Sequence, residues 1–147
     1  MGAHPYYYSV KYQTDIDAAL QELRQREFQA GRYNPAVRFI RFPIRADSPA
    51  PGAKHASIDE AREEAAEDGT RSILDIGGIA DEPNFCVAAP LPGDELTRYF
   101  CTAQPTNEIV SKNLGFMDAI ERGHCIYFTI YNDGKPNELF FAGYSFD

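Results

Sequence analysis

The chain has 147 residues, of which 44% are hydrophobic, and a formal net charge of −8 at pH 7. This length favours a single α+β domain over residues 1–147 with its own core. The acidic balance argues against binding nucleic acid or an anionic membrane through a basic surface. No apolar run approaches the ~20 residues that a membrane-spanning helix needs, and the first residues lack a signal-peptide pattern. We therefore expect a cytoplasmic protein.

The first half of the chain shows two strand patterns and one helix pattern. Residues 6–13 are rich in Tyr and Val, which suit a half-buried strand. Apolar residues then recur at helical spacing, and Gly31 stands where a helix commonly ends, so a helix is expected over residues 15–30. Residues 37–42 alternate and predict a second strand, ended by a proline. Residues 46–56 contain Pro and Gly and predict a loop.

The second half predicts three helices and further short strands before the C-terminus. Residues 57–68 begin with a capping box and predict an acidic helix. Residues 72–76 and 85–89 are short apolar runs that favour strands. Two more helices are expected over residues 94–101 and 106–123.

The chain ends in a predicted β-hairpin. Asp133 and Gly134 are typical of a two-residue type I′ turn. With that turn, Phe128 faces Leu139 on the core side of the hairpin. The order of elements then predicts an α+β fold, with a mixed or antiparallel sheet closed by the hairpin and about four helices packed mainly on one face.

Residues 57–68 are unusual because half of them are carboxylates. On a helix they form four like-charge pairs at i,i+4, each of which costs roughly 0.2–0.5 kcal/mol. A helix with this repulsion either faces only water or presents its charge to a basic partner. The candidate partner-binding residues are Asp59, Glu60, Glu63, Glu64, Glu67 and Asp68.

A strongly acidic, small α+β chain without a catalytic motif resembles, in charge and size, the immunity proteins that neutralise bacterial toxins. This resemblance implies a non-catalytic protein-binding module, an inhibitor or regulator that attracts a basic protein through its carboxylates.

A second interpretation is a small-molecule-binding domain or an enzyme with a polar pocket. Asp75 interrupts an apolar run, so it either lies at a strand end or pairs with a polar residue. The candidate pocket residues are Arg32, Tyr33, Asp75, Tyr131 and Tyr144. A structural, hydrogen-bonded carboxylate is the alternative for Asp75.

Residues 73–78 (ILDIGG) resemble the first motif of S-adenosylmethionine-dependent methyltransferases, which implies close approach of the backbone to a ligand. The third glycine of that motif is missing, so we expect a strand ended by a turn. His124 and Cys125 are adjacent, and on a strand they point to opposite faces. No metal-ligand spacing occurs either. We therefore expect no catalytic residue, metal or cofactor.

A third interpretation is self-association. The aromatic run at residues 6–8, or the second face of the hairpin, provides a surface for a homodimer.

Overall fold

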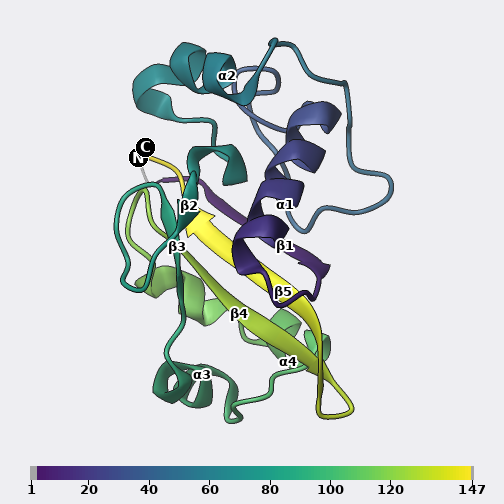
Figure 1. Ribbon diagram of the computed structural model, residues 1–147, viewed down its shortest axis with the longest axis vertical. Coiled ribbons are helices and arrows are strands. Elements are labelled where there is room, and N and C mark those ends of the chain that lie inside the picture. Colours follow the sequence, from purple (N-terminus) through teal and green to yellow (C-terminus); the bar gives the residue numbers. More distant parts are fainter. Residues whose placement is uncertain (1–2, 147) are drawn as a thin grey trace.

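The chain folds into a five-stranded sheet with helices on both faces (Figure 1). A computed structural model describes residues 3–146. The strands are β1 (Pro5–Lys11), β2 (Gly78–Ile79), β3 (Val87–Pro90), β4 (Cys125–Asn132) and β5 (Lys135–Tyr144). The α-helices are α1 (Ile16–Ala30), α2 (Ile58–Ala65), α3 (Gly93–Phe100) and α4 (Asn107–Lys112). Three short 3-10 helices complete the described elements: η1 (Ala66–Asp68), η2 (Ile73–Asp75) and η3 (Leu114–Ala119).

The sheet is mixed, with the strand order β1-β5-β4-β3-β2. Strand β5 pairs antiparallel with both β1 and β4, whereas β2, β3 and β4 run parallel to one another. Helices α3 and α4 lie in the connection from β3 to β4, because parallel neighbours require a crossover. The expected α+β class is therefore confirmed. Strand β1 lies at one edge of the sheet.

The C-terminal hairpin turns at the expected residues but pairs in a different register. Asp133 and Gly134 both have positive φ, 52° and 74°, as a type I′ turn requires. A register shift at Ile130 then pairs Phe128 with Phe140. The predicted pairing of Phe128 with Leu139 is therefore wrong, because a bulge adds one residue to β5 and a one-residue slip exchanges the two faces of a strand.

Both faces of the sheet are buried, in contrast to the one-sided arrangement expected from the sequence. On one side, Leu20 and Leu23 of α1 belong to a buried cluster with Phe141. On the other side, Phe116 belongs to a cluster with Phe128. Figure 1 shows α1 in front of β5 and α4 behind it. Strands β4 and β5 are apolar on both faces, and each face needs its own cover.

Two expected strands are absent from the described chain. Residues 37–42 have no regular secondary structure, and Phe42 packs its ring on Tyr7 and Tyr8, with ring centroids 5.6 and 5.2 Å apart. Residues 72–76 form a 3-10 turn instead, because the Ser72 hydroxyl accepts a hydrogen bond from the Leu74 N–H at 3.2 Å. In both segments side-chain interactions outweigh the apolar pattern.

Two helices are shorter than expected. The acidic helix ends at Ala65, since Ala66 has a φ of 50°, and only a 3-10 turn follows. The helix expected over residues 106–123 divides at Asn113, whose side chain donates to the Ile109 carbonyl at 2.7 Å.

Candidate functional site

The acidic helix presents its carboxylates to solvent. Ser57 caps the helix by accepting from the Glu60 N–H at 3.1 Å, while Ile58, Ala61 and Ala65 are buried beneath it. All six predicted partner-binding residues are exposed: Asp59, Glu60, Glu63, Glu64, Glu67 and Asp68. The predicted stripe of negative charge therefore lies on the surface.

One of these carboxylates is tied to the interior. His55 Nε2 lies 3.2 Å from Glu64, and the His55 Nδ1 is 2.8 Å from the Tyr33 hydroxyl. Tyr33 is fully buried and also accepts from the Lys54 N–H at 3.0 Å. Glu64 thus anchors the loop that carries His55 to the acidic helix. The other five carboxylates have no such structural contact in the described chain, and they are the ones left as candidates for partner binding.

The five residues of the predicted polar pocket are distributed over several environments. Asp75 is 2% exposed and accepts from the Thr70 N–H at 2.9 Å, which is a structural arrangement. Tyr131 donates its backbone N–H to Pro105, and Tyr144 packs against the cluster on the α4 side of the sheet. Among these five residues only Arg32 lines the cavity described below.

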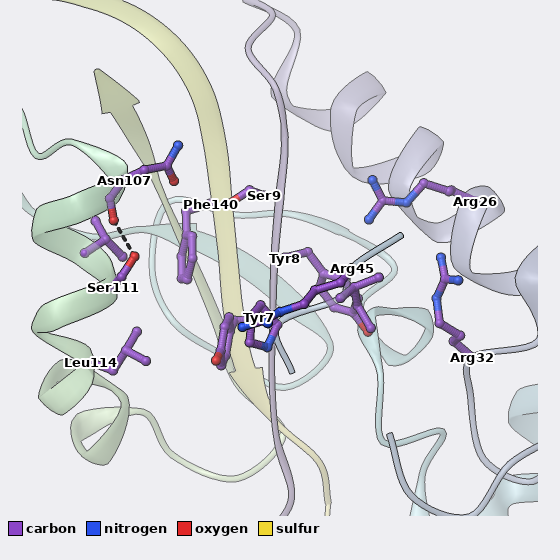
Figure 2. Close-up of a pocket in the computed structure, with 13 residues that line it drawn as sticks. Tyr7, Tyr8, Ser9, Arg26, Arg32, Arg45, Asn107, Ser111, Leu114 and Phe140 are labelled. Atoms are coloured by element: carbon purple, nitrogen blue, oxygen red, sulfur yellow. Dashed lines mark hydrogen bonds between the residues drawn. The ribbon is translucent and has the colours of Figure 1, made fainter. Parts of the chain in front are cut away.

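A cavity of about 620 Å³ lies beside the edge strand β1 (Figure 2). Its size falls within the range of small-molecule sites in proteins, roughly 300–1,000 Å³. Residues from α1, β1, β5, α4 and the loop after residue 42 form its walls. They include Tyr7, Tyr8, Ser9, Arg26, Arg32, Arg45, Asn107, Ser111, Leu114 and Phe140.

The cavity is cationic although the chain is acidic. Its described lining contains three arginines and no carboxylate. Behind Arg26 and Arg32 lies Glu27, which is fully buried. Arg32 donates to the two oxygens of Glu27 at 2.7 Å each, and Arg26 Nε donates at 2.8 Å. Hydrogen bonding to Glu27 also raises the pKa of the Arg32 guanidinium. One carboxylate thus fixes two cations at the cavity wall.

The third arginine, Arg45, has no side-chain partner in the described part of the chain. Within residues 3–146 the guanidinium of Arg45 makes no hydrogen bond or ion pair. It lies near Tyr7, whose pKa is raised by burial and lowered again in part by the charge of Arg45. In Figure 2 the side chains of Arg26, on α1, and Arg32, beyond the end of that helix, extend toward the centre of the cavity, where Arg45 lies beside Tyr7 and Tyr8. The cluster carries two net positive charges once Glu27 is included.

The remaining walls are aromatic and neutral. Tyr7 and Phe140 stack with their ring centroids 5.7 Å apart and an interplanar angle of 21°. On the α4 side, the Ser111 hydroxyl donates to the Asn107 carbonyl at 2.6 Å, and the Asn107 amide is bonded to Glu138. The cavity therefore offers guanidinium donors on one side and apolar or neutral surface on the other.

Within the described part of the chain no cluster of side chains could hold a metal ion. Among residues 3–146 no group of three or more His, Cys, Asp or Glu side chains converges. None of the described helices is long and apolar enough to cross a membrane.

No protein-family model, curated protein or solved structure matches this chain. The functional argument therefore rests on the geometry of the cavity and of the acidic helix.

Sequence reasoning named Arg32 but missed Glu27, Arg26 and Arg45, which organise the cavity with it. Glu27 lies four residues after Leu23 and seven after Leu20, within the buried stripe of α1. A carboxylate at such a position requires a partner, and Arg24, Arg26 and Arg32 are the nearest basic residues in the sequence, of which the structure pairs Arg26 and Arg32 with Glu27. This pattern is visible in the sequence, whereas the contribution of Arg45 depends on the path of a loop.

Proposed function

We propose that the protein is a non-catalytic binding module whose cavity beside β1 holds an anionic group. The observation that carries the proposal is the fully buried Glu27, which orients Arg26 and Arg32 at the cavity wall next to the unpaired Arg45. Guanidinium groups match carboxylate and phosphate oxygens with two parallel hydrogen bonds. A pair that is already fixed loses little side-chain entropy when an anion binds.

Short-range bonds, and not the field of the whole protein, must provide the affinity. The net charge of −8 repels anions at long range, so attraction is confined to the cavity. The three arginines gather at the cavity although the chain as a whole is acidic. This arrangement is consistent with anion binding that is confined to the cavity. The buried carboxylate behind it neutralises only one of the three charges.

Pyrophosphate and glutarate are suitable first probes, since they carry the two oxyanion types that arginine binds. Calorimetry should show binding, and NMR should show shifts of the Arg26 and Arg32 Nε resonances. Arg45→Gln should weaken binding about tenfold, because it removes charged donors without unpairing Glu27. Arg98→Gln removes the same charge from α3, where Arg98 is exposed beside Glu95, and should leave binding unchanged. Equal losses in the two variants, or no binding of either anion, would contradict the proposal.

The acidic helix supports a second candidate, the binding of a basic protein. Within the described chain, Asp59, Glu60, Glu63, Glu67 and Asp68 are exposed and make no side-chain ion pair. Like the immunity proteins that the chain resembles in charge and size, such a module would use its carboxylates to speed association. Charge reversal of Asp59, Glu63 and Glu67 to Lys should reduce the capture of a basic partner. It should also make that capture less dependent on salt concentration. Glu64 is left intact because it anchors His55. Unchanged capture at all salt concentrations would exclude the candidate.

A further inference from the structure

The edge strand β1 has backbone groups that β5 does not use. Tyr12 donates its N–H to Asn137 at 3.1 Å, and His4 accepts from Ser145 at 3.0 Å, so the even-numbered residues bond to β5. In an antiparallel pair the alternate residues point their N–H and C=O groups the other way. Ser9 and Lys11 therefore direct these groups to the free edge. Pro5 fits this alternation, because it has no N–H to present there.

The free edge is covered at one end and open at the other. Phe42 packs on Tyr7 and Tyr8, so the loop covers the strand there. Ser9 and Lys11 are both exposed. A second cavity, of about 570 Å³, continues along β1 from Ser9 to Gln13 and shares Ser9 and Arg26 with the first. We call the two cavities together the β1 groove.

We propose that the ligand of the β1 groove is an acidic peptide in extended conformation, which adds to the sheet as a strand beside Ser9 and Lys11. This inference rests on the proposed function, since Arg26, Arg32 and Arg45 are the groups that bind the peptide's carboxylates. Peptides bind in this way to other exposed sheet edges, with backbone bonds for affinity and side-chain pockets for selectivity.

The two sides of the groove specify an alternating pattern in the peptide. Side chains of an added strand alternate between the two faces of the sheet. On one face they meet Arg26 of α1 and Arg32 just beyond it, and on the other they meet Val110 and Leu114. Carboxylates should therefore alternate with apolar residues. Glu22 and Glu138 line the far end of the second cavity, so the acidic side chains belong at the arginine end.

Charge favours a peptide over a second copy of this chain. Pairing of β1 with β1 of another copy about Ser9 would bring the two Arg26 side chains together, and each chain carries a net charge of −8. Like charges that face each other across strands destabilise pairing. An acidic peptide is also repelled at long range by the net charge of the chain, but at the arginine end of the groove it brings carboxylates, and not further arginines, to Arg26.

The test uses amide hydrogen exchange of the whole chain with the capped peptide Ala-Glu-Val-Glu-Val-Ala. At saturation the Ser9 and Lys11 amides should exchange at least about tenfold more slowly, while those of Tyr8 and Val10, already bonded to β5, should change little. The same composition in the order Ala-Glu-Glu-Val-Val-Ala is the matched control and should bind at least about fivefold more weakly. Equal binding of the two orders, or no added protection of Ser9 and Lys11, overturns the inference.

A matched pair of variants separates this inference from the anion site. Lys11→Pro removes an N–H from the free edge, whereas Lys11→Ala keeps it, and Lys11 does not line the arginine cavity. Lys11→Pro should bind the peptide about fivefold more weakly than Lys11→Ala, and the two variants should bind pyrophosphate equally. If Lys11→Pro unfolds the chain, methylation of the peptide nitrogens that face β1 makes the same test on the unmodified protein.

Three outcomes are distinguishable. Pyrophosphate binding without protection of Ser9 and Lys11 by the peptide overturns the inference and leaves the anion site standing. Failure of both ligands overturns both. Protection of the same amides by increasing protein concentration alone shows that a second copy occupies the edge, which also overturns the peptide assignment.

Discussion

Arg32 follows Gly31, the C-cap of α1, and its side chain folds back onto the fully buried Glu27. The Nε and Nη2 of Arg32 each donate a hydrogen bond of 2.7 Å to one oxygen of that carboxylate. The backbone N–H of Arg32 also donates to the Glu27 carbonyl at 3.1 Å. Gly31, with a φ of 77°, makes the turn that allows both contacts. The end of the helix and the charge pair therefore form one unit, and this unit shapes the cationic wall of the cavity.

Arg32→Gln should destabilise the fold by about 3 kcal/mol, because it leaves Glu27 buried with only Arg26 to neutralise it. Glu27→Gln combined with Arg32→Gln should recover part of this loss, since no buried charge remains. Urea unfolding of the three proteins measures the difference. A double variant less stable than Arg32→Gln would show that the pair has no such coupling.

Gly31→Ala should destabilise by at least about 2 kcal/mol, because a side chain in the left-handed region is strained. A Cβ at Gly31 would also lie 2.1 Å from the carbonyl oxygen of Gly52. Gly93→Ala is the control, since nothing lies within 4 Å of a Cβ built there. Its stability should stay within about 0.5 kcal/mol of the parent in thermal and urea unfolding. Similar losses in both variants would contradict the close packing at Gly31.

The parts of the fold that depend on local chemistry are predictable from the sequence. The turn at Asp133 and Gly134 follows from the preference of these residues for positive φ, and α1 follows from its apolar spacing and Gly31. The register of the hairpin does not follow, because the bulge between Ile130 and Tyr131 depends on how β5 fits between two neighbouring strands. Phe42 likewise leaves its apparent strand to pack on Tyr7, a contact that local pattern does not reveal.

Of the three arginines in the cavity only Arg32 is a predicted pocket residue, and the residues that line the cavity with it are not the predicted ones. Asp75 was expected either in a pocket or in a structural hydrogen bond, and the structure shows the bond to Thr70. Arg45 reaches the cavity through the path of a long loop, which is determined by tertiary packing and leaves no periodic pattern.

The three cysteines should differ sharply in their reaction with a thiol reagent. Cys101 is exposed, Cys86 is half-buried and Cys125 is buried. Burial raises the pKa of both Cys86 and Cys125, which lowers the fraction of reactive thiolate. Ellman's reagent should therefore modify one thiol rapidly, and Cys101→Ser should remove that fast phase. Fast modification that persists in Cys101→Ser would place another thiol at the surface.

Asp75 links the stability of the fold to pH. Burial raises the pKa of this carboxyl above its usual value of 3.8, and the hydrogen bond from the Thr70 N–H only partly opposes the rise. A raised pKa means that the folded chain holds the proton more tightly than the unfolded chain. The contribution of Asp75 to stability is therefore greatest below the unfolded pKa. It decreases as the pH rises through the interval up to the folded pKa, and is constant above it.

Asp75→Asn should abolish this part of the pH dependence. The amide keeps a carbonyl oxygen to accept from Thr70 but does not ionise. Relative to the parent, the variant should therefore gain stability as the pH increases above the usual carboxyl pKa of 3.8, because only the parent must bury a charge. Urea unfolding across this range gives the difference directly. Asp68→Asn, at an exposed position nearby, is the control and should show no such trend. A difference between parent and Asp75→Asn that does not change with pH would mean that Asp75 ionises equally readily in the folded and unfolded chains.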